Sequence, residues 1–332
     1  MHCKTAIALI LTFLAGILIV DTQAAEPAKR LKAGIIGLDT SHVVEFVKLL
    51  GKPTATGELA ELSIVAAYPG GSDDMPDSRN RVKQYTDAVR AAGVAIVGSI
   101  DELLPKVDVV LLESVDGRTH LAQARPVILA GKPLFIDKPM AASLADAIDI
   151  FRLAKAKNVP CFSSSSLRFS AGFQAARHGR FGGVRNCTAW SPMRVEPHHP
   201  DLFWYGIHGV EALFTVMGSG CQQVTRVGPR EVAGVWKGGR RGIFQANDAG
   251  YGAKVEGTSG AGDAGSYDGF APLVVEIVKF FKTGKPPVTA EETLEILAFM
   301  EAADQSKRRG GAPVAIESVM KRAEQEVAAR RR

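Results

Sequence analysis

The segment from Lys32 to Leu50 (KAGIIGLDTSHVVEFVKLL) constrains the fold of this chain more than any other. A short apolar run is followed directly by Asp-Thr-Ser and then by apolar residues at helical spacing, so the segment predicts a strand, a tight turn and a helix. Gly37 ends the strand, and the helix can be capped by Asp39, Thr40 or Ser41. The free N–H groups at the start of such a helix face a crevice, where they can bind an anion.

This turn departs from the fingerprint of dinucleotide-binding proteins. In that fingerprint, G-x-G-x-x-G, glycines let the backbone approach a pyrophosphate. Gly37 is retained here, but Asp39 and His42 stand at the second and third glycine positions. The next strand, 62–67, should end in an acidic residue that binds the ribose, yet it leads into Tyr68. Either Asp39 caps the helix while His42 packs beneath a cofactor, or the pyrophosphate pocket has been abandoned.

The N-terminal residues show the pattern of a targeting segment. Lys4 is followed by a mainly apolar run, 6–20, and then by small residues up to Ala25. The pattern predicts a secretory signal peptide, residues 1–24, and it is too short to be read first as a membrane span. Because no twin arginine precedes it, we expect Sec-type export to the periplasm or the extracellular space, with no stable membrane insertion after cleavage. An uncleaved anchor is the alternative.

Composition excludes several classes of protein. Hydrophobic residues make up 46% and charged residues 23% of the chain, as in ordinary soluble proteins of two domains. The formal charge of +5 is concentrated near the end, so 318–332 is expected to be a basic, solvated tail. No basic stripe is interleaved with aromatic residues, which argues against nucleic-acid binding. Three of the four cysteines follow the expected signal peptide, and they lack metal-type spacing: Cys161, Cys187 and Cys221. They allow one disulfide at most, and we expect them to pack in cores.

The first part of the chain, 30–160, predicts an α/β domain with a Rossmann-like, doubly wound parallel sheet. Apolar strands alternate there with helical patterns. Ligands of such sheets bind beyond the carboxyl ends of the strands. Three loops, 37–42, 113–120 and 137–139, each follow an apolar strand, so we expect them to converge on one site.

The second part, 161–317, predicts another α/β domain with an open, mainly antiparallel sheet. It begins with a Ser-rich segment, 161–169, and contains a glycine-rich stretch, 250–269. Strand-like and helical patterns fall between and after these segments. The expected strands are 184–190, 224–227 and 232–236, and the expected helices are 272–283 and 290–307.

The order of these pieces resembles the Gfo/Idh/MocA family of sugar-type oxidoreductases from Lys32 to about Ile316. The segments that carry the resemblance are GIIGLDTSH, GRTHLAQARPVILAGKPLFIDKPMAASLADA, YGIHGVEALFTVMG and GKPPVTAEETLEILAFMEAADQSKRRGGAPVAI. The resemblance implies a Rossmann domain for NAD or NADP and a second domain that supplies the substrate face. It also implies a carbohydrate substrate and a homo-oligomer.

A lysine is the first catalytic candidate. Asp137-Lys138-Pro139 matches the family motif E-K-P, whose lysine lies at the nicotinamide and substrate end of the cleft. A lysine drawn into a crevice can polarise a hydroxyl group. The alternative is a solvated lysine after a strand.

A histidine is the second catalytic candidate. Gly206-x-His208 matches the end of the family motif D-x-G-x-H, whose histidine takes the proton of the substrate hydroxyl group, although Trp204 replaces the Asp. Imidazole suits a general base near neutral pH. Glu211 lies three residues on, shares a helical face with His208 and can orient its ring. The alternative is a histidine that caps or packs the helix.

The resemblance also implies a set of cofactor-binding positions. Of these, His120 is more often structural than catalytic. The set comprises Gly37, Asp39, Thr40, Ser41, His42, Asp116, His120 and Lys138.

We expect no metal site, although one loop offers an alternative. His198 and His199 follow Glu196 in a Pro-rich loop, and with His208 they could supply nitrogen and oxygen ligands for zinc or a similar ion. A loop rim that contacts sugar is the simpler interpretation.

Three functional hypotheses follow. The leading one is an exported NAD(P)-dependent oxidoreductase of carbohydrate metabolism, in which His208 takes the hydroxyl proton, Lys138 polarises the same oxygen and the nicotinamide accepts hydride. The second is a cofactor-free or metal-assisted lyase or glycoside-cleaving enzyme on the same scaffold, motivated by the lost glycines and by export. The third is a sugar-binding protein with an inactive site.

Overall fold

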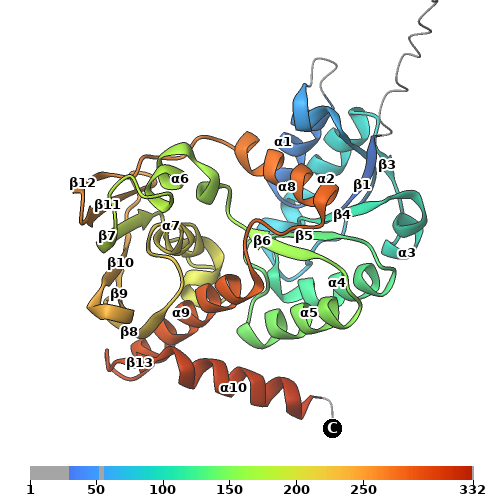
Figure 1. Cartoon of the computed structure of the whole chain (residues 1–332). Helices are drawn as coiled ribbons and strands as arrows, with labels where there is room; N and C mark the ends of the chain where they lie inside the picture. Colours follow the sequence, from blue (N-terminus) through green and yellow to red (C-terminus); the bar gives the residue numbers. More distant parts are fainter. Residues whose placement is uncertain (1–29, 52–55, 331–332) are drawn as a thin grey trace, which may run out of the picture.

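The computed structural model describes residues 30–51 and 56–330, which form two domains, each built on one sheet (Figure 1). The expected signal peptide, 1–24, lies outside the described residues. Within the described ranges, every helix is too short or too polar to cross a bilayer.

The first domain contains a six-stranded parallel sheet in the order β3-β2-β1-β4-β5-β6. The strand order reverses between β1 and β4, and such a switch point is where ligands bind in doubly wound sheets. The predicted fold class is confirmed. The strands are β1 (Leu31–Ile36), β2 (Leu62–Tyr68), β3 (Ala95–Ile96), β4 (Val109–Leu112), β5 (Leu134–Asp137) and β6 (Cys161–Ser164).

Helices cover both faces of this sheet, and one of them comes from the second half of the chain. Helix α8 (Ala271–Thr283) lies beside α1 in Figure 1, and its Leu273, Val274 and Ile277 share a core with Val43 and Phe46. The division at residue 160 is therefore wrong in this respect, since α8 completes the first domain. The other elements are α1 (Ser41–Leu50), η1 (Gly57–Ala60), α2 (Pro76–Ala91), α3 (Ile100–Leu103), η2 (Leu104–Lys106), η3 (Gly117–Thr119), α4 (His120–Leu129) and α5 (Leu144–Ala156).

The boundary itself also needs correction. Cys161–Ser164, read as the start of the second domain, is strand β6 and pairs in parallel with β5. Its four residues are all buried, because this strand lies under helices on both faces. The chain leaves the first domain only after Ser164.

The second domain contains a seven-stranded mixed sheet in the order β12-β11-β7-β10-β9-β8-β13. Only β7 and β10 run parallel among its described pairs, so the sheet is mainly antiparallel, as predicted. Strands β10 to β12 were not expected, because their glycines weaken the strand signal. The strands are β7 (Val184–Ser191), β8 (Cys221–Gly228), β9 (Glu231–Trp236), β10 (Arg241–Ala246), β11 (Gly252–Gly257), β12 (Gly260–Asp263) and β13 (Val314–Ala315).

The expected C-terminal tail is largely a packed helix, α10 (Ile316–Ala329). Four of its residues are buried in the hydrophobic core that also contains residues of α5, α7 and α9: Ile316, Val319, Ala323 and Val327. The prediction of a solvated tail is therefore wrong for these residues. Apolar residues at helical spacing outweigh the basic ones, which stay on the outer face. The remaining elements are η4 (Ser166–Phe169), α6 (Ala171–Arg177), the π-helical turn η5 (Leu202–Gly206), α7 (Ile207–Met217), η6 (Lys237–Gly239) and α9 (Ala290–Arg308).

Core packing is confirmed for the cysteines. Cys161, Cys187 and Cys221 are free and buried. Burial raises the pKa of Cys187 and Cys221 to about 12, so both stay protonated thiols at neutral pH.

Candidate active site

The turn after β1 is held by two residues. Gly37 has φ of 89°, and a Cβ atom there would collide with the backbone and hydroxyl of Ser114, so glycine allows the loops after β1 and β4 to touch. Thr40 is the N-cap of α1, and its Oγ1 faces the N–H of His42 at 3.5 Å. Of the three expected caps, Thr40 is the one the structure uses.

Asp39 has another role. Its side chain is fully buried, and its Oδ1 accepts a hydrogen bond from the N–H of Val115 at 2.9 Å. Its Oδ2 accepts one from Ser78 Oγ at 2.6 Å. These bonds tie the β1 turn to the loop after β4 and to α2, directly across the switch point between β1 and β4. Asp39 therefore bridges the crevice instead of capping the helix.

His42, Asp137 and Lys138 form a contiguous group beside this bridge. His42 Nδ1 lies 3.0 Å from Asp137 Oδ2, and Lys138 Nζ donates to the same oxygen at 3.2 Å. Burial opposes ionisation, but His42 and Lys138 outweigh it and lower the pKa of Asp137. Asp137 is therefore a carboxylate that positions Lys138, which is only 8% exposed and is not a solvated lysine.

Lys138 and His208 line one pocket of about 310 Å³. His208 Nδ1 lies 2.7 Å from Ser165 Oγ, and burial, reinforced by Lys138 and His42, lowers the pKa of His208 well below its usual value. The imidazole is thus neutral near pH 7. The other residues that line the pocket are Thr40, Ser41, His42, Asp77, Arg81, Tyr85, Val115, Pro139, Arg194, Trp204 and Tyr205.

Glu211 does not act on His208 as expected. Its Oε1 accepts hydrogen bonds of 2.7 Å from Ser164 Oγ and from Arg168 Nε. Although Glu211 and His208 share a helical face, the buried guanidinium of Arg168 attracts the carboxylate more strongly than a neutral imidazole does. Ser165 orients His208 instead. The only sequence signal for this role is the serine-rich composition of 161–169.

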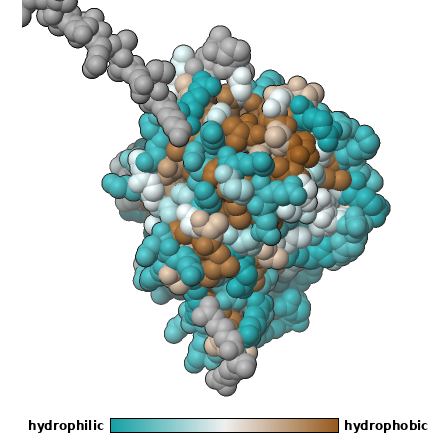
Figure 2. Space-filling view, turned by 90° about the vertical axis from the view of Figure 1, so that its right-hand side faces the viewer, coloured by the Kyte–Doolittle hydropathy of each residue, from teal (hydrophilic) through white to brown (hydrophobic). Residues whose placement is uncertain are grey.

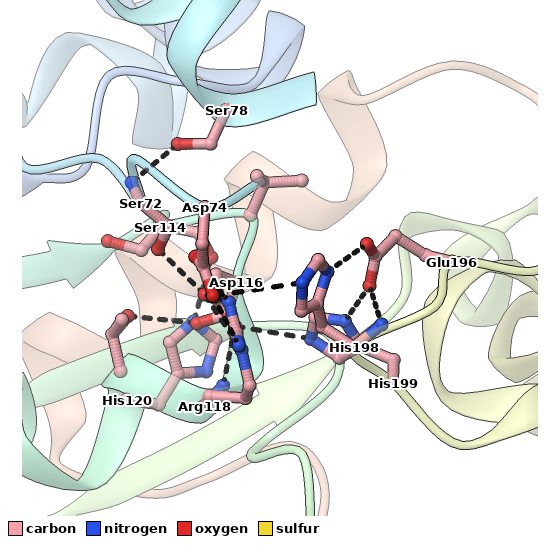
Figure 3. Close-up of polar contacts among 12 residues, drawn as sticks. Ser72, Asp74, Ser78, Ser114, Asp116, Arg118, His120, Glu196, His198 and His199 are labelled. Carbon is pink, nitrogen blue, oxygen red and sulfur yellow. Dashed lines mark hydrogen bonds and ion pairs between the residues drawn. The ribbon is translucent and has the colours of Figure 1, made fainter. Parts of the chain in front are cut away.

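A polar network joins the two domains over the loop after β4 (Figure 3). His199 is buried between Glu196 Oε2, 2.7 Å from its Nδ1, and Asp116 Oδ1, 3.3 Å from its Nε2. Arg118 pairs with both Asp116 and Asp74. We call this set the domain clasp: Asp74, Asp116, Arg118, Glu196, His198 and His199.

The expected loop histidines therefore bind carboxylates. His198 and His199 both contact Glu196, whereas His208 lies with Ser165 in the pocket. In the ranges 30–51 and 56–330, no group of three potential ligands within 4.8 Å of one another includes them.

Two residues that were expected to bind a cofactor contact other groups of the protein instead. His120 is fully buried, and its ring nitrogens face the carbonyl oxygens of Ser114 and Met140. Asp116 is held by Arg118 and by Ser72 Oγ, which donates to it at 2.7 Å. His120 is thus structural, and Asp116 belongs to the domain clasp.

An apolar hollow of about 530 Å³ lies between α1, α2 and β2. Its ionisable lining residues are Arg30 and Lys48, and neither an acidic residue nor a histidine accompanies them. Figure 2 shows hydrophobic side chains gathered on one area of the molecular surface amid polar ones. The pocket of Lys138 and His208 remains the candidate active site.

The sequence comparisons agree with this geometry. Residues 77–165 match the family model GFO_IDH_MocA, described as an oxidoreductase family with an NAD-binding Rossmann fold. This match covers part of the first domain, and within it the chain is similar to that family. A search of curated proteins finds no match.

Solved structures of similar fold cover nearly the whole chain. A probable dehydrogenase from Thermotoga maritima is 20% identical, with a TM-score of 0.68 over 87% of this chain and 100% of its own. A putative myo-inositol dehydrogenase from Sinorhizobium meliloti is 17% identical, with a TM-score of 0.69 over 86% and 99%. A Lactobacillus casei scyllo-inositol dehydrogenase solved with NAD(H) and scyllo-inositol is 15% identical, with a TM-score of 0.69 over 87% and 100%. At these identities the likeness concerns the fold.

The fold family implies a nicotinamide dinucleotide, and the described residues fit its pyrophosphate poorly. The crevice between the loops after β1 and β4 is crossed by the Asp39 carboxylate, which bonds to Val115 and Ser78. A carboxylate repels a phosphate and fills the space that glycine leaves open in the usual fingerprint. The conventional cradle is therefore not present in this arrangement.

Sequence reasoning missed Glu113 as a site residue. It directly follows β4, is fully buried and faces the Asp137 group. A charged residue at the carboxyl end of an apolar parallel strand was the signal available.

Proposed function

We propose that this chain is an enzyme of the Gfo/Idh/MocA oxidoreductase family that acts on a hydroxyl group of a sugar or sugar derivative. The observation that carries the proposal is the shared pocket of Lys138 and His208. Polar surroundings, including Arg81, Arg194 and Tyr205, suit a substrate with many hydroxyl groups.

The two residues have complementary roles. A proton on His208 Nδ1, donated to Ser165 Oγ, leaves Nε2 with a lone pair that can take the substrate hydroxyl proton. The Lys138 ammonium, held by Asp137, stabilises the developing negative charge on that oxygen. A nicotinamide dinucleotide, when bound, would supply the hydride acceptor.

A second candidate is an elimination or hydrolysis that proceeds without a nicotinamide nucleotide. The specific observation in its favour is the Asp39 bridge across the switch point. The domain clasp adds a second barrier, because it closes the two domains over the loop after β4.

Nucleotide content separates the two candidates. The purified chain is denatured and its supernatant is analysed for NAD and NADP by mass spectrometry, and both are titrated calorimetrically into the intact protein. Co-purified or tightly bound nucleotide supports oxidation and reduction. If neither nucleotide binds, the redox candidate fails and sugar elimination and hydrolysis become the assays of choice.

Substitution tests the roles of the two residues. We expect Lys138→Met and His208→Ala each to reduce kcat/KM by about 10²-fold or more, as for loss of a general acid or base. Full turnover in both variants on a substrate of the wild type would contradict this assignment.

We also propose that the chain is exported. The support is the charged, apolar and small-residue pattern of residues 1–24. Fractionation of cells of the source organism tests it, with a cytoplasmic marker enzyme as control. Recovery of the unprocessed chain with that marker would contradict export.

A further inference from the structure

Three side chains from different loops converge beside the pocket. His42 lies in the first turn of α1, Glu113 follows β4 and Asp137 ends β5. One ligand atom from each lies within 4.8 Å of the other two. Imidazole and carboxylate are the ligands that zinc, manganese and similar divalent ions take in proteins.

The carboxylates in this group are under-bonded. Both oxygens of Glu113 and Oδ1 of Asp137 are buried without a hydrogen-bond partner. Buried polar atoms are nearly always paired, because an unpaired one loses its hydration without compensation. Three unpaired oxygens in one place therefore indicate a missing positive partner.

Charge points the same way. Two carboxylates, Glu113 and Asp137, lie beside Lys138 and His42, whose Nζ and Nδ1 are 3.2 Å and 3.0 Å from Asp137 Oδ2. Both contacts are made to Oδ2, so Oδ1 and the two Glu113 oxygens are left without a hydrogen-bond partner. A cation would pair with these three oxygens.

We propose that His42, Glu113 and Asp137 bind a divalent transition-metal ion such as Zn²⁺ or Mn²⁺. His42 and Lys138 line the pocket, so an ion held by this group would lie beside the substrate space. There the ion would polarise a substrate oxygen as a Lewis acid. The site does not depend on the roles proposed for Lys138 and His208, since metal binding is measured without substrate.

The competing occupant is a proton. Burial, reinforced by the neighbouring Asp137, raises the pKa of Glu113 well above its usual value, although Lys138 opposes the shift. A protonated Glu113 could then share its proton with Asp137. This alternative predicts no metal stoichiometry, whereas the metal site predicts one ion per chain.

The test uses the full chain purified without an affinity tag. Metal content is measured by mass spectrometry, the protein is stripped with a chelator and dialysed, and Zn²⁺ and Mn²⁺ are titrated calorimetrically. We expect one equivalent of at least one ion to bind the wild type, and Glu113→Gln to weaken its affinity at least ten-fold. Glu196→Gln, another buried glutamate beside histidines, is the matched control and should retain the wild-type affinity.

Several outcomes overturn the proposal. These are no stoichiometric binding of either ion to the stripped wild type, equal affinity in Glu113→Gln, or loss of the site in Glu196→Gln instead. Circular dichroism checks the fold of each variant. If Glu113→Gln fails to fold, His42→Gln, whose side chain is 14% exposed at the pocket, decides by the same ten-fold criterion.

Discussion

Asp39 illustrates how one side chain changes what a loop can hold. The residue lies where a glycine would leave room for a pyrophosphate, and its carboxylate instead satisfies Val115 N–H and Ser78 Oγ. Burial raises the pKa of Asp39 even though both hydrogen bonds oppose the shift. The turn thus holds an acidic side chain of the protein itself where the usual fingerprint binds the anion of a ligand.

Substitution of Asp39 should expose its structural role. Asp39→Ala leaves a buried N–H and a hydroxyl without partners, so we expect the free energy of unfolding to fall by about 1 to 3 kcal/mol. Asp39→Asn keeps an acceptor for Val115 and should lose less. Urea denaturation followed by circular dichroism measures both variants, and an unchanged midpoint in Asp39→Ala would contradict the bridge.

We expect His208 to set the acid limb of activity. Its pKa is lowered by burial and by Lys138, so the imidazole remains an unprotonated base below its ordinary pKa of about 6.5. We expect kcat/KM to stay constant as pH falls to about 6.5 and to decline only at lower pH. A pH profile of kcat/KM checks this, and an acid limb above pH 7 would assign the base to another group.

At the scale of elements, Arg168 holds three helices together. The residue lies in η4 and donates from Nε to Glu211 of α7 and from an Nη atom to Glu292 of α9, both at 2.7 Å. Arg177 of α6 pairs with Glu292 as well. Because the guanidinium is buried, these ion pairs fix how α6, α7 and α9 meet.

Removal of this guanidinium should be strongly destabilising. Arg168→Met leaves Glu211 buried without its charge partner, so we expect the free energy of unfolding to fall by about 3 to 5 kcal/mol. Arg330→Met is the matched control, because Arg330 forms exposed ion pairs with Asp146 and Glu326 and should change stability by about 1 kcal/mol or less. Similar losses in the two variants on denaturation would contradict the role of Arg168.

At the scale of the whole molecule, we expect the contact between the two domains at the domain clasp to depend on pH. Burial alone would lower the pKa of His199, but its bonds to Asp116 and Glu196 outweigh burial and raise it. Hydrogen bonds from His199, Arg118 and Ser72 likewise outweigh burial and lower the pKa of Asp116. The charged forms of both partners are therefore stabilised by contact between the domains.

The sign of the pH effect follows. A raised histidine pKa gives stability that is complete below its ordinary value of about 6.5 and is lost as pH rises through the raised value. The lowered carboxylate pKa values of Asp116 and Glu196 keep their contribution above their ordinary values of 3.8 and 4.5. The clasp is thus strongest from about pH 5 to 6.5.

His199→Gln tests this window. We expect the variant to lose about 1 to 3 kcal/mol of stability relative to the wild type near pH 5.5, and less above pH 8. Thermal unfolding across this range measures the difference, and His178→Gln, at an exposed histidine, controls for general effects of pH. A difference that does not vary with pH would show that His199 pairs without being charged.

Local sequence patterns determined much of this protein. The strand, turn and helix at 32–50, the parallel first sheet and the mainly antiparallel second sheet follow from periodicity and from turn residues, which act between neighbours along the chain. The rule that ligands bind beyond the carboxyl ends of parallel strands also predicts that Gly37, Val115 and Lys138 lie near one crevice.

Only the tertiary structure decided which charged groups meet. Asp39 and Val115 are 76 positions apart, and the Glu113 carboxylate faces His42 and Asp137 because three strands end side by side. The return of α8 to the first sheet and the packing of α10 depend likewise on surfaces that distant segments provide. Burial, partner and pKa of a titratable group are properties of such assembled surroundings, so a pattern along the chain names the candidates and the fold assigns their partners.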